Sequence, residues 1–287
     1  MRIARVFPRK TALTPDDPLS FVGDPPPGVE VDAVEISVAF KYDIPEAERL
    51  LGVWSDIAPV AIGGPALGDP GGDFVPGRYV KKGGVITSRG CPNRCPHCSV
   101  WRREGKRVRE LPIREGWNVL DDNLLACSKE HVEAVFEMLY WQKHQPSFTG
   151  GLEAAKLLPW HVEHLNRRKP ESVFFAYDTP DDLEPLVEAG KLLYQPGLGL
   201  TRDGERISNR MRCYVLVGFP LNKDTPEKAL VRMEETVRAG FWPMAMVFRP
   251  EDAESKYEIP EEWTAFQRHW VRLPAVKIEA RLRGWTK

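Results

Sequence analysis

Three cysteines lie close together at Cys91, Cys95 and Cys98, with the spacing C-x3-C-x2-C. Thiolates select zinc or iron–sulfur centres, and both usually have four ligands. In this segment a fourth ligand is missing unless His97 supplies it. The segment therefore predicts one of two centres. One is a zinc site completed by His97 or by a distant residue. The other is a [4Fe–4S] cluster on three cysteines, in which one iron stays open for a ligand that is not protein.

The cysteine segment follows an apolar, strand-like stretch at residues 84–87, and this arrangement resembles the signature of the radical S-adenosylmethionine (SAM) enzymes. The resemblance implies that the three cysteines hold a [4Fe–4S] cluster whose open iron is chelated by the amino and carboxylate groups of SAM. It implies an electron donor, such as a flavodoxin or ferredoxin, that reduces the cluster. SAM is then cleaved to methionine and a 5′-deoxyadenosyl radical, which takes a hydrogen atom from an unidentified substrate. In the family the residue before the third cysteine lies along the SAM adenine and is often aromatic, and here it is His97.

The composition is that of an ordinary globular protein. The chain has 287 residues, of which 42% are hydrophobic and 28% charged, and the net charge is −1. This charge gives no general attraction to nucleic acid or to a membrane. Residues 1–7 are too short and too charged a stretch for a signal peptide. No apolar run approaches the length of a membrane span. Five cysteines, three of them clustered, do not resemble a disulfide framework, so we expect a reducing, cytoplasmic location.

Strand-like and helix-like segments alternate from residue 84 onward, which is typical of a parallel sheet with covering helices. Six such pairs match the open (β/α)6 partial TIM-like barrel of the radical SAM enzymes, and we predict this α/β fold for residues 84–287. The predicted strands are 84–87, 117–121, 147–149, 172–177, 213–218 and 244–249. The last helix is expected at residues 261–270. Residues 191–210 are rich in glycine and polar residues and are not assigned.

Residues 1–83 form a second predicted unit, a small α/β domain with strands at 3–7, 34–40 and 58–65 and a helix beginning at Pro45. The unit resembles the end of the cobalamin-binding domain that precedes the cluster domain in one radical SAM branch. No histidine occurs in the first 90 residues to coordinate cobalt, so we expect a truncated domain without a working cobalamin site. A cobalamin-dependent radical SAM methyltransferase is the alternative within the family. A non-catalytic zinc-binding module is the alternative outside it.

Carboxylates follow the second and third predicted strands, at the sheet edge where parallel α/β folds collect their ligands. Asp121 and Asp122 resemble the Asp-Asp motif of the cobalamin-type branch, where an acidic residue receives the SAM ammonium. Glu153 follows Gly150 and Gly151, whose missing side chains allow close approach of the backbone to a ligand. Each of the three carboxylates is a candidate to accept a charge-assisted hydrogen bond from the ammonium. For the aspartates, capping of the next helix is the structural alternative.

Further candidates close the remaining strands: Tyr177 the fourth, Gly218 the fifth and Arg249 the sixth. We expect Arg249 either to pair with the SAM carboxylate in a bidentate fork or to form a salt bridge at the rim of the barrel. Cys127 and Cys213 lie outside the cysteine segment. We expect both to be buried structural thiols, with donation of a hydrogen atom to a substrate radical as the alternative.

A basic run, residues 101–109, directly follows the cysteines and contains five arginines and lysines. Such a run suits the phosphates of a nucleotide or nucleic-acid substrate. Related enzymes also carry a glycine and basic residues here without binding nucleic acid. The class of substrate therefore stays open.

Overall fold

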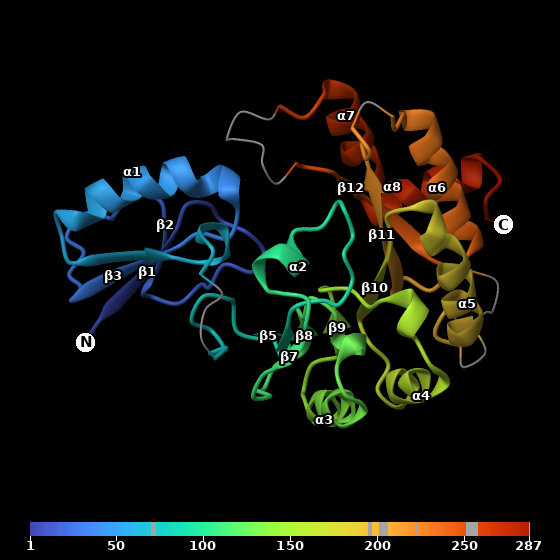
Figure 1. Ribbon diagram of the computed structural model, residues 1–287, viewed down its shortest axis with the longest axis horizontal. Helices are drawn as coiled ribbons and strands as arrows, with labels where there is room; N and C mark the ends of the chain where they lie inside the picture. The colour runs from blue at the N-terminus through green and yellow to red at the C-terminus, as the bar shows by residue number, and fades with distance from the viewer. Residues whose placement is uncertain (70–72, 195–196, 201–205, 222, 251–257, 287) are drawn as a thin grey trace.

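Two hydrophobic cores divide the chain into a smaller N-terminal unit and a larger C-terminal unit (Figure 1). The structure is a computed structural model and describes residues 1–287 apart from 70–72, 195–196, 201–205, 222, 251–257 and 287. The smaller core contains residues between Ala4 and Ala58, and the larger core contains residues between Val85 and Ala280. Both units combine a parallel sheet with helices, so the chain is an α/β protein. The domain boundary at residue 83 stays a prediction.

The N-terminal unit is a four-stranded parallel sheet in the order β2-β1-β3-β4, with one helix along the sheet. Its main elements are β1 (Ile3–Phe7), β2 (Ser20–Val22), β3 (Ala33–Ser37), α1 (Ile44–Ser55) and β4 (Val60–Gly63). Pro45 lies in the first turn of α1, where its missing N–H would have no partner in any case. Leu50 and Trp54 of this helix are fully buried in the smaller core. β2 is not among the predicted strands, because it lies in a proline-rich stretch without alternation.

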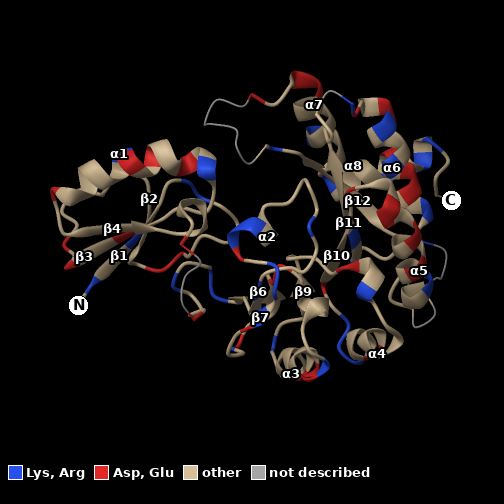
Figure 2. Cartoon of the chain, in the orientation of Figure 1, with Lys and Arg blue, Asp and Glu red and all other residues tan. Residues whose placement is uncertain are grey.

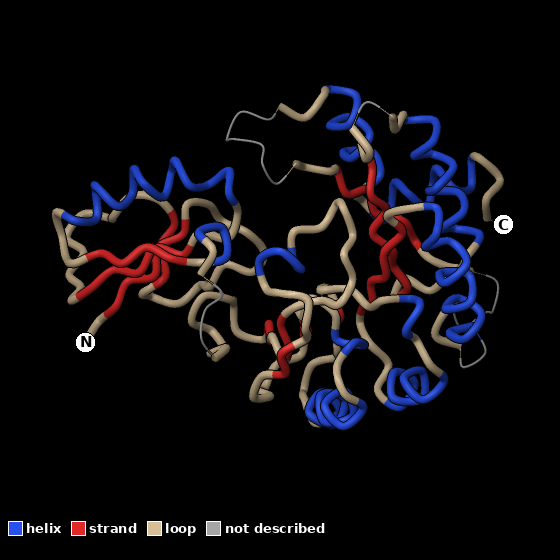
Figure 3. Tube along the Cα trace, viewed as in Figure 1, coloured by secondary structure: helices blue, strands red, loops and turns tan. Residues whose placement is uncertain are grey.

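The larger unit contains six parallel strands in the order β5-β8-β9-β10-β11-β12, which is also their order along the chain. Figure 3 draws the strands of both units in red and the helices in blue. Their bounds are β5 (Gly84–Val85), β8 (Asn118–Val119), β9 (Ser147–Phe148), β10 (Ser172–Tyr177), β11 (Met211–Val217) and β12 (Trp242–Val247). Each strand overlaps a predicted one, although the first three contain only two residues each. The sequential parallel order is the one that the alternation predicts. Closure of this sheet into a partial barrel stays a prediction.

Helices pack along the larger sheet as α3 (Lys129–Tyr140), α4 (Pro159–Arg167), α5 (Leu183–Tyr194), α6 (Pro226–Arg238), α7 (Glu261–Trp270) and α8 (Leu273–Leu282). Ser128 caps α3, since its Oγ accepts the backbone N–H of His131 at 3.2 Å. The expectation that residues 261–270 form the last helix is wrong, because α8 follows after two residues. Pro274 occupies the first turn of α8 and so does not prevent the helix, and its Val276 is completely buried.

The chain around the cysteines is more ordered than a basic loop. α2 (Val100–Arg103) follows the cysteine segment, and β7 (Arg109–Glu110) pairs antiparallel with β6 (Ser88–Arg89). The β6–β7 pair joins the two ends of the cysteine-bearing loop. In the unassigned segment 191–210, α5 continues to Tyr194 and Leu200 pairs with Ile207, while residues 195–196 and 201–205 lie outside the described part of the chain.

No helix among the described residues combines the length and the apolar character needed to cross a membrane.

A candidate cysteine-centred site

Cys91, Cys95 and Cys98 lie in the loop between β6 and α2, beyond the carboxyl end of β5, and all three are half-buried free thiols. The pKa of Cys95 is raised to about 11, chiefly by burial and in smaller part by the neighbouring Cys98 and Cys91. Burial also raises the pKa of Cys98, and Cys91 adds to that rise. The sulfurs of Cys91 and Cys98 thus disfavour ionisation of Cys95, and the sulfur of Cys91 disfavours ionisation of Cys98. A positively charged metal centre would reverse this effect and stabilise the thiolates.

Asp121 holds the chain that leads from β5 to the cysteines. Its Oδ1 accepts the backbone N–H of Thr87 at 2.6 Å, and its Oδ2 accepts the hydroxyls of Thr87 and Ser88 at 2.6 and 2.7 Å. The carboxyl is only 1% exposed, and burial raises its pKa, although these hydrogen bonds act in the opposite direction. Both oxygens therefore have partners within the protein, and this aspartate orders the approach to the cysteine loop.

Asp122 acts on the next turn of the same chain. Its Oδ2 accepts the backbone N–H of Gly90 at 2.8 Å, directly before Cys91. Gly90 has φ +90°, and a Cβ there would lie 2.5 Å from the carbonyl oxygen of Arg107, so only glycine fits. Burial raises the pKa of Asp122, while the Gly90 hydrogen bond lowers it. Neither aspartate caps α3, because the Ser128 hydroxyl accepts the backbone N–H of His131 at the start of that helix.

Asn123 connects the cysteine loop to Glu153, and the sequence-based candidates omit it. Its Nδ2 donates to Glu153 Oε2 at 2.6 Å and contacts Cys91 Sγ at 3.4 Å. The side chain is 4% exposed, yet its Oδ1 is buried without a hydrogen-bond partner in the described protein. Such an orphaned acceptor costs stability unless a ligand or water satisfies it. Its position directly after the Asp121–Asp122 pair was the available signal.

His97 projects from the cysteine loop toward the ends of the later strands. Its Nε2 lies 3.1 Å from Asp178 Oδ2, just beyond β10. Its ring packs edge-on against Phe219, beyond β11, with the ring centroids 5.5 Å apart. Phe219 in turn contacts Phe248, beyond β12, at 4.8 Å. The Nδ1 of His97 is buried without a hydrogen-bond partner in the described protein. A second orphaned polar atom therefore lies beside the cysteines.

The candidate glycines have structural explanations. A Cβ on Gly150 would lie 2.6 Å from the carbonyl oxygen of Asp121, so this residue permits close packing of β9 against the end of β8. Gly151 and Gly218 both have positive φ, at +93° and +78°. The N–H of Gly218 donates to Asp224 Oδ2 at 2.7 Å. Gly151 differs from the other two because a Cβ there would meet only one atom within 4 Å, so the space beside it is open.

Two other candidates have partners away from the cysteines. Tyr177 is buried in the larger core and donates its hydroxyl to Glu235 Oε2 of α6 at 2.6 Å. Burial raises its pKa, and the Glu235 carboxylate raises it further. Arg249 is exposed, and its guanidinium lies 5.0 Å from the ring centroid of Tyr42 in the N-terminal unit. The structure therefore places Tyr177 against a covering helix and Arg249 at a contact between the two units.

The remaining cysteines are separate from the loop. Cys213 lies in the middle of β11, is completely buried, and has a strongly raised pKa because of that burial. Cys127 is half-buried just before α3, and burial raises its pKa to about 11, opposed by a hydrogen bond with Ser88. Neither thiol is favoured as a thiolate at neutral pH.

The basic run surrounds a buried acid. The side chain of Glu104 is inaccessible to solvent and forms ion pairs with Arg103 and Arg109 at 3.2 and 3.1 Å. The indole of Trp101 donates to the carbonyl oxygen of Cys95 at 3.0 Å and so fixes α2 to the cysteine loop. Figure 2 shows the arginines of α2 in blue between the two units. Part of the positive charge of this run is therefore used to organise the loop.

The donor arrangement bears on the choice between a single ion and a cluster. Within the described residues, no three side chains of His, Cys, Asp or Glu converge on a point where one ion would be held. A mononuclear zinc site requires such convergence. In a [4Fe–4S] cluster the cysteines bind different irons, so their sulfurs stand apart. A cluster therefore does not require the three sulfurs to meet at one point.

No protein-family model matches the sequence, and no curated protein matches it. Among solved structures, the chain is similar to the radical S-adenosylmethionine methyltransferase TsrM from Kitasatospora setae, whose structure holds cobalamin and a [4Fe–4S] cluster. The TM-score is 0.57 at 12% sequence identity, and the match covers 86% of this chain and 75% of that one. At this identity the similarity is one of fold: the chain is an α/β protein with parallel sheets that resembles a radical SAM protein.

Proposed function

We propose that the protein is a radical SAM enzyme, in which Cys91, Cys95 and Cys98 hold a [4Fe–4S] cluster and SAM completes the fourth iron. The observation that carries the proposal is a pair of orphaned buried atoms: His97 Nδ1 within the cysteine loop, and Oδ1 of Asn123, whose side chain contacts Cys91. Buried polar atoms are nearly always hydrogen-bonded. Two such atoms beside three clustered thiols are best explained by a polar ligand that binds there.

The residues around the loop take distinct roles in this proposal. Glu153 accepts from the SAM ammonium and is oriented by Asn123, which donates to it. His97 lies along the adenine and is held by Asp178. When bound, the cluster and SAM supply the chemistry: an electron from a donor such as a flavodoxin or ferredoxin cleaves SAM to methionine and a 5′-deoxyadenosyl radical, which abstracts a hydrogen atom.

The substrate lies on the uncovered face of the larger sheet in this proposal. Ala176 is exposed although it lies in β10, between two neighbouring strands. Side chains alternate along a strand, so Ala176 shares its face with Asp178, the partner of His97. Met246 of β12 is also 40% exposed. This face therefore offers apolar space next to the cysteine loop, and we propose that the reacting carbon of the substrate sits there.

A cobalamin-dependent radical SAM methyltransferase is the second candidate. One observation favours it: the match to TsrM extends over more of the chain than residues 84–287 and so includes part of the N-terminal unit. The absence of histidine from the first 90 residues weighs against a cobalt ligand of the usual kind. We therefore keep the methyltransferase as the alternative and the radical SAM enzyme without cobalamin as the proposal.

Iron and sulfide assays on anaerobically reconstituted protein test the proposal. We expect four irons and four sulfides per chain, and their loss when Cys91, Cys95 and Cys98 are replaced together by Ala. Cys127→Ala is the matched control, because it removes a half-buried thiol outside the loop and should leave the iron content unchanged. Stoichiometric zinc without iron uptake would establish the zinc-binding module instead.

A further inference from the structure

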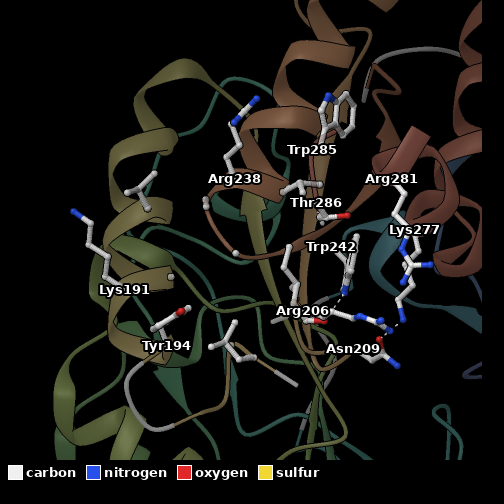
Figure 4. Close-up of a pocket in the computed structure, with 18 residues that line it drawn as sticks. Lys191, Tyr194, Arg206, Asn209, Arg238, Trp242, Lys277, Arg281, Trp285 and Thr286 are labelled. Carbon is white, nitrogen blue, oxygen red and sulfur yellow. Dashed lines mark hydrogen bonds between the residues drawn. The ribbon is translucent and has the colours of Figure 1, made fainter. Parts of the chain in front are cut away.

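A cavity of about 1110 Å³ opens at the end of the larger sheet opposite to the cysteines (Figure 4). Its walls come from α5, α6 and α8 and from the segments that enter β11 and β12, including Ile207 and Gly240. These segments lie at the amino ends of the strands, whereas the cysteine loop lies beyond the carboxyl end of β5. The cavity is large enough for a ligand of nucleotide size.

The described residues that line this cavity include five cations and no aspartate or glutamate. The cations are Lys191, Arg206, Arg238, Lys277 and Arg281. Two of them are paired, because Lys191 bonds to Glu188 at 2.6 Å and Arg238 to Glu234 at 2.6 Å. In Figure 4 both of these side chains point away from the centre of the cavity.

The other three cations gather on one side of the cavity. Lys277 donates to the side-chain oxygen of Asn209, and Arg206 and Arg281 lie beside it in Figure 4. Among the described residues, no carboxylate forms an ion pair with Arg206, Lys277 or Arg281. Partial burial lowers the pKa of Lys277, and the charges of Arg212, Arg281 and Arg206 lower it further. Within the described residues, positive charge is thus concentrated here without an ion-paired carboxylate, which favours binding of an anion.

Aromatic side chains complete the cavity. Trp242 is buried and donates its indole N–H to the carbonyl oxygen of Ile207 at 3.1 Å, which fixes its ring in the wall. Tyr194 is 56% exposed and lies at the opposite side of the cavity. Trp285 lines the part of the cavity at the top of Figure 4. Flat apolar walls next to arginines suit a ligand that joins a planar organic body to phosphate groups.

We propose that this cavity is a binding site for a small phosphate-bearing ligand of nucleotide size, whose phosphates contact Arg206, Lys277 and Arg281. The site is separate from the cysteine loop, and the proposal does not depend on the radical SAM function. Arginine presents paired N–H donors that match phosphate oxygens, and lysine adds a point charge. The planar part of the ligand then lies against the aromatic wall.

Calorimetric titration of the full chain with ADP, pyrophosphate and adenosine tests the proposal. We expect ADP to bind, pyrophosphate to bind more weakly and adenosine to show no binding. The affinity for ADP should fall as the salt concentration rises, because the contacts are ionic and partly exposed. Adenosine binding as tightly as ADP, or no binding of ADP, would overturn the proposal.

Three variants separate the site from general charge effects. Lys277→Gln and Arg281→Gln should each weaken ADP binding by roughly tenfold to hundredfold, since charge-assisted hydrogen bonds are lost. Arg272→Gln removes the same charge from the start of α8, outside the lining residues, and should change the affinity less than about threefold. Equal losses in Arg272→Gln and Lys277→Gln would contradict the assigned site. Thermal unfolding of each variant checks that it is folded.

Discussion

Replacement of Glu153 is the substitution that most clearly separates SAM binding from cluster binding. Asp121 has both oxygens bonded to Thr87 and Ser88, and Asp122 bonds to the backbone before Cys91. Glu153 bonds through Oε2 to Asn123, and no described residue donates to its Oε1. Among the described residues near the cysteines, its carboxylate therefore keeps free accepting capacity.

The size of the effect follows from the bond that is lost. A hydrogen bond between charged groups contributes about 1.5–3 kcal/mol, and each 1.4 kcal/mol is about one decade in affinity. Glu153→Ala should therefore weaken SAM binding by roughly tenfold to hundredfold. Glu153→Gln keeps a neutral acceptor, about half as strong, and should lose roughly threefold to tenfold. The iron content should match that of the parent in both variants, because no thiol is changed.

Anaerobic equilibrium dialysis with labelled SAM, beside an iron assay, measures both quantities. Glu235→Ala is the matched control, because it removes a carboxylate that accepts one hydrogen bond, from Tyr177, on the helix-covered side of the sheet. That variant should keep its SAM affinity. Asp121→Ala and Arg249→Ala complete the set, with loss of stability expected for the first and parental SAM affinity for the second. If Glu153→Ala also binds SAM like the parent, the ammonium is not held where we place it.

Three further predictions concern stability and cofactor choice. Burial raises the pKa of Asp121 in the folded protein above its unfolded value of about 3.9. The free energy of unfolding should therefore fall as the pH rises from about 3.9 through the folded-state pKa. In urea unfolding, Asp121→Asn should lack the part of this pH dependence that comes from Asp121. Cys213→Ala should cost about 1–2 kcal/mol in urea unfolding because it empties buried volume, yet leave the iron content of reconstituted protein unchanged. Protein incubated with cobalamin should release it on gel filtration, as judged by visible absorption; stoichiometric retention would favour the methyltransferase.

Much of the larger sheet can be predicted from the alternation of apolar and polar segments. β10 has the predicted bounds, Ser172–Tyr177, because a continuous apolar run flanked by polar residues marks both of its ends. β5 ends at Val85, short of the predicted Thr87, because Asp121 accepts the backbone N–H and the hydroxyl of Thr87, and that contact spans 34 residues of sequence. Local patterns do not contain such a contact.

The site is harder to predict than the fold, and Tyr177 shows why. β10 is apolar on both faces, so its sequence has no alternation from which the facing of each residue can be read. The adjacent Asp178, not Tyr177, has its carboxylate at His97. Asn123 is likewise not predicted as a site residue, because an amide beside two aspartates gives no charge signal, yet its side chain contacts both Cys91 and Glu153.

The central claim is that the cysteine loop supports reductive cleavage of SAM. The most direct measurement is the formation of 5′-deoxyadenosine when anaerobically reconstituted protein is mixed with SAM and a chemical reductant. We predict that 5′-deoxyadenosine and methionine appear only when reductant is present, and that both are absent when Cys91, Cys95 and Cys98 are replaced by Ala. Fully reconstituted and reduced protein that binds SAM but forms neither product would contradict the account.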